Sequence, residues 1–390
     1  MMKNKKIREL SFLLIGLLMI TVLLLLPTGY EDAQIYREAE RCKAEVLSTD
    51  ESSIISSGLI QSGEQICRLK ILTGKFRGRE LKGVNMLGGS LESDKIYEPG
   101  DRALIVISVG KDGEPTNIIM SDYYRLDKEI LLAVIFIVFL VIIAGANGFR
   151  AVFSFIMSVL LIWKVLVPLY LNGYNPIGTG LMVTAFLTVM IIYFVYGFDI
   201  KALTAIMGSL LGTLTTCIVG AVFTDVFKIH GAVMSHSESL LYAGYQHLNL
   251  TAIFMSSIFI GASGAMMDLA VDITSAVNEV VEKKPDIDWK EAFRSGMNVG
   301  RAAMGTMTTT LLLAYSGGYV ALLMVFMAQG TPVSHILNYK YVSAEILDTM
   351  VGSFGLVTVA PFTALVSGIL LTRRKRKAEK TTEKPAEKIV

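Results

Sequence analysis

The sequence has few of the residues from which proteins build metal and redox centres. It contains three cysteines and four histidines among 390 residues. It has no Cys-x-x-Cys pair, His-Glu-x-x-His motif, phosphate-binding Gly-rich loop ending in Gly-Lys, or Gly-x-Ser-x-Gly nucleophile elbow. The sequence therefore predicts no cofactor and no metal site, and it makes a membrane enzyme the least favoured of the functions weighed below.

Charged residues are also scarce, and long apolar runs are abundant. Charged side chains make up 18% of the chain and hydrophobic ones 53%, with a mean hydropathy of +0.55. A soluble domain is about 45–50% apolar even when glycine is counted. Runs long enough to cross a bilayer occur at 10–27, 129–146, 149–171, 176–197, 201–223, 250–271, 302–327 and 350–371. The sequence thus predicts an α-helical polytopic membrane protein with about eight transmembrane helices in a lipid bilayer. Its net charge of +2 gives no reason to expect a nucleic-acid partner.

The placement of lysine and arginine predicts the orientation of these spans. Cations gather in the first eight residues, at Arg150, at Lys201, in the loop 273–300 and directly after residue 372. The short loops on the opposite side contain few. Because cytoplasmic loops carry an excess of Lys and Arg, we expect both termini to be cytoplasmic, which an even number of spans allows.

Changes in composition divide the chain into four predicted parts. Residues 1–30 are expected to form an N-terminal transmembrane anchor, with a cleaved signal peptide as the alternative. Residues 31–125 contain no span and are expected outside the cytoplasm. Residues 126–372 are predicted to form a seven-helix membrane core, and the charged segment 373–390 a basic, disordered cytoplasmic tail.

The exported segment 31–125 alternates apolar and polar residues with the period of two that is typical of strands. Candidate strands are 41–48, 65–73, 78–85, 102–109 and 115–121. Five short strands predict a small all-β barrel of the OB-like or SH3-like kind, placed between the first and second transmembrane helices. We expect it to have a structural role or to dock an envelope protein partner. Cys42 and Cys67 both lie in it, and the sequence leaves open whether they form a disulfide.

Two carboxylates near the end of the predicted sixth span are the most informative feature. Asp268 and Asp272 are one helical turn apart and share a helix face with Gly261 and Gly264. A charge at the bilayer centre costs roughly 2.5–3.5 kcal/mol even on the lenient insertion scale. This face is therefore expected to meet water or protein, with Arg301 of the seventh span within reach as a counter-charge. The two interpretations left open are a solute or proton pathway and a structural ion pair that joins two helices.

Other polar residues extend this prediction. Asn298 and Thr308 flank Arg301 on the seventh span and are candidates for lining a pathway. Lys164, in the third span, is expected to extend its ammonium group to the outer interface, with an ion pair to Asp225 or a substrate anion as the alternative. The four histidines fall in predicted extracytoplasmic loops and are expected to be solvated.

Three segments carry a resemblance to a known family. They are Gly261-Ala-Ser-Gly-Ala-Met-Met-Asp268, Gly296-Met-Asn-Val-Gly-Arg301-Ala-Ala-Met-Gly305-Thr-Met-Thr, and Lys164-Val-Leu-Val-Pro168 followed by Asn172-Gly-Tyr-Asn-Pro176. Together they resemble the YibE/F-like family of bacterial multi-pass membrane proteins, over roughly 130–371. The resemblance implies a location in the bacterial inner membrane and places Asp268 and Arg301 among the signature residues. It implies no activity, because none is established for the family.

Two functions of different classes follow from these observations. The favoured hypothesis is a secondary, ion- or proton-coupled permease of an unknown small solute. In it Asp268 binds the coupling ion or proton, Asp272 and Asn298 shape the site, and Arg301 is the counter-charge. The alternative is a non-transporting membrane scaffold or envelope assembly factor that acts through the exported domain at 31–125.

Overall fold

The computed structural model describes residues 2–30 and 39–383 and divides into two compact units. One unit is Gly29–Gly145, and the other is Met1–Thr28 together with Ala146–Val390. The division places the first part of the helix that follows the β domain, up to Gly145, with that domain. The boundary expected at residue 125 therefore lies twenty residues earlier than the division in the structure.

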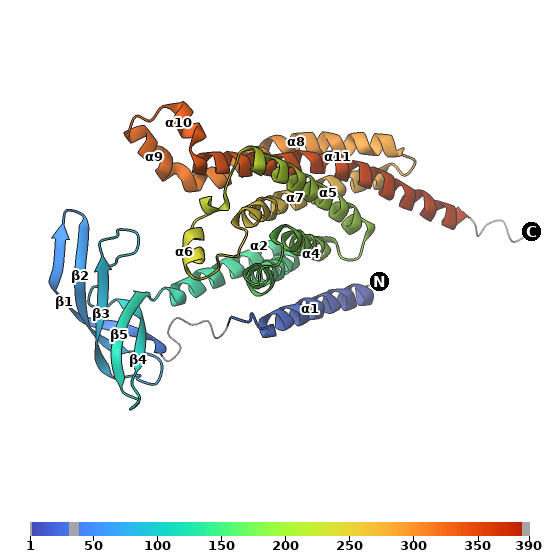
Figure 1. Ribbon diagram of the computed structural model, residues 1–390. Helices are drawn as coiled ribbons and strands as arrows, with labels where there is room; N and C mark the ends of the chain where they lie inside the picture. The colour runs from blue at the N-terminus through green and yellow to red at the C-terminus, as the bar shows by residue number, and fades with distance from the viewer. Residues whose placement is uncertain (1, 31–38, 384–390) are drawn as a thin grey trace, which may run out of the picture. The chain divides into compact units, whose positions relative to one another are not determined.

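The first unit is built on a five-stranded closed barrel (Figure 1). Its strands are β1 (Ala39–Ser57), β2 (Ile60–Ile71), β3 (Glu80–Gly88), β4 (Arg102–Val109) and β5 (Pro115–Tyr123). They close in the order β1-β2-β3-β5-β4, with β3 and β5 parallel and the other pairs antiparallel. Alternate residues such as Ala44, Val46, Leu69 and Ile105 are no more than 1% exposed and fill the interior. The prediction of a small five-stranded barrel is confirmed.

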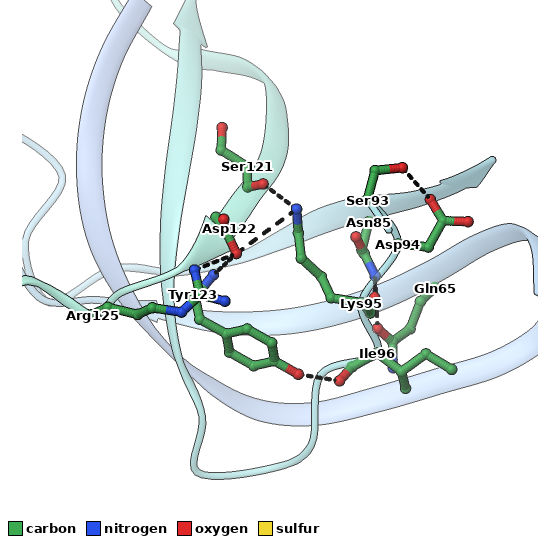
Figure 2. Close-up of polar contacts among 10 residues, drawn as sticks. All are labelled: Gln65, Asn85, Ser93, Asp94, Lys95, Ile96, Ser121, Asp122, Tyr123 and Arg125. Atoms are coloured by element: carbon green, nitrogen blue, oxygen red, sulfur yellow. Dashed lines mark hydrogen bonds and ion pairs between the residues drawn. The ribbon is translucent and has the colours of Figure 1, made fainter. Parts of the chain in front are cut away.

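A buried polar network fixes the segment that leads into β4 (Figure 2). The Gln65 Nε2 donates to the Tyr97 carbonyl at 2.9 Å, while the Gln65 Oε1 accepts from the Tyr97 N–H at 3.0 Å. The Asn85 Nδ2 donates to the same Gln65 oxygen at 3.1 Å and to the Lys95 carbonyl at 2.6 Å. Gln65 and Asn85 are 0% and 2% exposed. Because buried amides are costly when unpaired, this network fixes the path of the segment across the barrel.

The same segment is held from outside by residues at the end of β5. The Tyr123 hydroxyl donates to the Ile96 carbonyl at 2.5 Å, and Lys95 donates to the Ser121 carbonyl. Figure 2 shows these contacts together with the Arg125–Asp122 ion pair, whose N and O atoms lie 3.0 Å apart.

Cys42 and Cys67 are buried in the barrel as free thiols. The β1–β2 register places Thr49, and not Cys42, opposite Cys67. Cys42 lies seven residues earlier in β1, about 20 Å of strand at ~3.3 Å per residue. A disulfide requires Cα atoms within about 7 Å, so the pairing that the sequence left open does not form in this fold.

The rest of the described chain is mostly helical. The helices are α1 (Met2–Leu25), α2 (Leu126–Leu161), the π-helix η1 (Ile162–Leu166), α3 (Val167–Leu171), α4 (Pro176–Tyr196), α5 (Ile200–Val226), η2 (Gly231–Val233), α6 (Ser237–Tyr242), α7 (Leu250–Lys283), α8 (Trp289–Ser316), η3 (Gly317–Tyr319), α9 (Val320–Ala328), α10 (Val333–Asn338) and α11 (Lys340–Glu383). Six stretches among the described residues are long and apolar enough to cross a membrane.

These six stretches differ from the eight expected spans in two places. The expected spans 129–146 and 149–171 fall in one stretch, Leu126–Leu171, interrupted at Gly145, where φ is 56° and ψ −129°. The apolar part of α1 among residues with described side chains is only Leu14–Leu25. Only glycine adopts a positive φ without strain, which is why the helix departs from regular geometry at Gly145.

Four long helices, α5, α7, α8 and α11, pack around the core of the second unit (Figure 1). Met266, Leu269 and Ile273 of α7 are 0% exposed. Gly208 and Gly212 of α5 allow a close approach to α11, because a Cβ on either would lie within 2.1 Å of a side-chain atom there. Glycines spaced by four residues on one helix face thus bring two helix backbones together.

α11 continues as a helix to Glu383, although the sequence predicts a disordered tail from residue 373. Arg374 forms an ion pair with Asp199, and the Arg376 Nη2 lies 3.7 Å from an Asp288 oxygen. Residues 373–383 are rich in Arg, Lys and Glu, which are good helix formers, so the helix extends where the charge content alone indicates disorder. Residues 384–390 lie outside the described residues.

Candidate functional site

The two acids of α7 lie on an exposed face of the helix. Asp268 and Asp272 are exposed, as are Gly264 and Gly261, one and two turns before Asp268. A Cβ on Gly264 would have no atom within 4 Å. The two acids and the small residues therefore share one exposed face of α7, as predicted. The opposite face of the helix is packed.

Tyr196, the last residue of α4, lies at the end of this acidic face. Its hydroxyl is 2.7 Å from the Val271 carbonyl and 2.6 Å from the Ser275 Oγ. Ser275 continues the exposed line of residues that begins with Asp268 and Asp272. Both hydrogen bonds fix α4 against α7 within one helical turn of Asp272.

α8 runs antiparallel to α7, and two glycines fix their register. A Cβ on Gly296 would lie 2.7 Å from a Val277 side-chain atom, and one on Gly300 would lie 3.1 Å from the Ile273 Cδ1. Arg301 is therefore at about the same depth as Asp272. Among the described residues, however, no ion pair joins Arg301 to either acid of α7. Arg301 and Asn298 are both exposed on α8, one turn apart.

The threonines of α8 direct their hydroxyls back to their own helix. The Thr308 Oγ1 donates to the Met304 carbonyl at 2.8 Å. Thr306, Thr309 and Thr310 make the same type of bond to Ala303, Gly305 and Thr306. Such bonds satisfy hydroxyls within an apolar helix. Thr308 therefore has its hydrogen bond inside α8.

Lys164 lies in the π-helix η1 and contacts the end of α1. Its Nζ donates to the Leu26 carbonyl at 3.1 Å. Asp225, the expected alternative partner, forms no ion pair with it in the described part of the chain. A carbonyl at a helix end is a suitable acceptor for an ammonium group, so the contact joins the first helix to the membrane core.

The structure brings together a second polar cluster that the sequence analysis missed. Tyr315 near the end of α8 and Glu345 and Asp348 near the start of α11 interact electrostatically. The Tyr315 Oη, Glu345 Oε1 and Asp348 Oδ1 are each buried without a hydrogen-bond partner. So is the Thr349 Oγ1. The sequence predicts a last span that starts at 350, so Glu345, Asp348 and Thr349 fall outside it, whereas α11 starts at Lys340. The i, i+3 spacing of the two acids was the available signal.

Two of the histidines make hydrogen bonds to the backbone. His230 accepts from the Ala232 N–H at 3.1 Å, and the His247 Nε2 lies 3.3 Å from the Leu171 carbonyl. Within the described part of the chain, no three or more His, Cys, Asp or Glu side chains lie together so that they could hold a metal ion.

The long apolar helices fit a multi-pass membrane protein that also carries a small β-barrel domain. The family model described as "YibE/F-like protein" matches residues 132–373, which is more than half of the chain. The chain therefore belongs to the YibE/F-like family, and the resemblance found in the sequence is confirmed. No curated protein and no solved structure matches it.

Proposed function

We propose that the protein is a secondary membrane permease, coupled to an ion or a proton, for a small solute. One observation carries the proposal: Asp268 and Asp272 lie in a long apolar helix, on a face where both acids are exposed. A charge facing lipid at the bilayer centre costs roughly 2.5–3.5 kcal/mol or more. An aqueous pathway along this face of α7 avoids that cost and gives the carboxylates access to a solute or cation.

The proposed topology has eight crossings with both termini in the cytoplasm of a bacterial cell. The 46 residues of Leu126–Leu171 would be about 70 Å long as one helix, roughly twice the thickness of the hydrocarbon core. A turn at Gly145 divides them into two crossings. The contacts of Arg374 with Asp199 and of Arg376 with Asp288 gather three cation-bearing segments at one end of the bundle, which supports a common cytoplasmic side.

We assign each residue a role from its proposed depth in the bilayer. Asp268 binds the coupling ion or proton, and Asp272 and Asn298 shape the site at its cytoplasmic end. Arg301 supplies positive charge at the depth of Asp272, as the contact of Gly300 with Ile273 indicates. Because Arg301 forms no ion pair with either acid among the described residues, we propose that it balances their charge across the aqueous pathway.

The test compares small molecules and metal ions inside and outside cells that lack the chain, carry it, or carry Asp268→Asn. We expect one solute to redistribute with the chain and to return to the deletion pattern with Asp268→Asn. Glu279→Gln is the matched control, because Glu279 lies on the same helix but its carboxylate is 61% exposed and paired with Lys283 at 2.9 Å. Full redistribution by Asp268→Asn would contradict the assigned role.

The second candidate function is a membrane scaffold whose barrel docks an envelope protein. Its support is a set of exposed apolar residues on the barrel, with Ile55, Leu59 and Leu91 71%, 83% and 73% exposed. Large exposed apolar residues close together are typical of interaction sites. The strand order with parallel β3 and β5 favours the OB-like alternative, a fold that often presents a binding face. If this candidate is right, deleting 31–125 removes the function and Asp268→Asn leaves it unchanged.

A further inference from the structure

Glu345 and Asp348 are half-buried acids in an apolar helix bundle. One oxygen of each carboxyl group is fully buried without a hydrogen bond. No Lys, Arg or His among the described residues forms an ion pair with either of them. An ionised carboxylate in such surroundings is strongly disfavoured unless it gains a proton or a cation.

Thr349 adds an independent observation from the same helix face. It is 4% exposed and its Oγ1 has no partner. Other threonines of the bundle, such as Thr216 and Thr372, bond to the carbonyl four residues earlier. The Thr349 hydroxyl does not, although it lies one turn from Glu345 and is free to donate to a group on that face.

Two glycine contacts show where this face of α11 points. A Cβ on Gly352, one turn beyond Asp348, would lie 3.1 Å from the Ala262 Cβ of α7. A Cβ on the neighbouring Gly261 would lie 2.9 Å from the Tyr315 hydroxyl. Asp348 and the Tyr315 hydroxyl therefore lie within about one helical turn of each other along α7.

We propose that Glu345, Asp348 and Tyr315 form a proton-binding site in which the two carboxyl groups share one proton and the hydroxyls of Tyr315 and Thr349 donate to the ionised form. This deepens the proposed function, because Gly261 lies on the same face of α7 as Asp268. Seven residues separate the two, about 10 Å along the helix. This cluster would be a proton-binding site on the extracytoplasmic side of the pathway, and Asp268 would be the second binding site in that pathway.

A proton fits the surroundings better than a metal ion. Among the described residues, Tyr315 and Tyr319 of the α8–η3 segment interact electrostatically with both acids. The nearest cation along α11, Lys340, has its Nζ 4.8 Å from the Tyr341 ring centroid. Only two of these groups are carboxyl groups, and no group of three or more His, Cys, Asp or Glu side chains that could hold a metal ion is found among the described residues.

The test is the labelling of the purified full chain in nanodiscs with dicyclohexylcarbodiimide, which reacts with protonated carboxyl groups in apolar surroundings. Labelling is located by peptide mass spectrometry over a pH series in choline chloride. We expect label on Glu345 or Asp348 that is lost progressively as the pH rises. Absence of label on both at every pH at which the protein stays folded would overturn the proposal.

Variants test the hydroxyl groups. Tyr315→Phe and Thr349→Val remove donors to the ionised form, so the pH at which labelling is half lost should shift upward. Thr188→Val is the matched control, because Thr188 of α4 is also 0% exposed with an unpartnered Oγ1. Equal curves for all three variants and the unchanged chain would overturn the role of the hydroxyls.

Two further arms distinguish a proton site from an alkali-ion site, and this site from the proposed transport function. If sodium chloride in place of choline chloride suppresses the label, the site binds an alkali ion and the proton assignment is wrong. Labelling of Glu345 and Asp348 is also measured in the Asp268→Asn variant. The labelling reaction does not depend on transport. Label at α11 without any transported solute would therefore leave this site standing while the proposed function fails.

Discussion

Replacing Gly208 by alanine tests how closely α5 packs against α11. A Cβ on Gly208 would lie 2.9 Å from the Thr363 Cα and 2.8 Å from its Cβ. It would meet the backbone of α11, which cannot move aside as the end of a flexible side chain can. Overpacking a filled interface costs about 1–3 kcal/mol, and Gly→Ala inside a helix gains up to about 1 kcal/mol. We expect Gly208→Ala to lower the free energy of unfolding by up to about 2 kcal/mol.

Gly305→Ala on α8 is the matched control. A Cβ there would have no atom within 4 Å, and the gain in helix propensity is the same. The difference between the two variants therefore isolates the overpacking, about 1–3 kcal/mol. Denaturant unfolding of the purified full chain in detergent, followed by the fluorescence of its two tryptophans, measures this difference. Equal unfolding midpoints for the two variants would refute the close packing of α5 on α11.

The remaining predictions concern the barrel. Backbone N–H groups, that of Gly88 first, donate to Asp94 and lower its pKa. Because the folded pKa is below the unfolded value, the contribution of Asp94 is present above about pH 4 and is lost as the pH falls further. Hydrogen exchange of the β3–β4 turn should therefore differ between Asp94→Asn and the unchanged chain at neutral pH and converge in acid. Burial raises the pKa of the Cys42 and Cys67 thiols to about 11. Both should resist maleimide at neutral pH until the barrel is unfolded, and early modification of either would contradict their burial.

The architecture was largely predictable because it follows from local patterns. Alternation with a period of two gave the five strands, and long apolar runs gave the helices. The strand order and the parallel pairing of β3 and β5 depend on contacts between distant segments. The interruption of Leu126–Leu171 at Gly145 depends on one residue's backbone angles. Neither is visible in the composition of a window of sequence.

The candidate site was predictable only as a helix face. The i, i+4 spacing of Asp268 and Asp272 fixes them on one side of α7 in any helical structure. Whether Arg301 reaches them depends on the register of α7 against α8, which Gly296 and Gly300 determine. The acids of α11 lie before the apolar run that marks the span, so a hydropathy window excludes them.

The position of the acids on α7 bears on the two interpretations of this face. A structural ion pair requires a partner within contact distance, and among the described residues neither Asp268 nor Asp272 has one. One side of α7 is held rigidly, with Met266, Leu269 and Ile273 at 0% exposure. The other side presents both carboxylates, and at Gly261 it reaches the Tyr315 hydroxyl and the acids of α11. A helix fixed on one side and polar on the other suits a pathway lined by α7 better than a joint between two helices, since sites on rigid elements hold their groups in place.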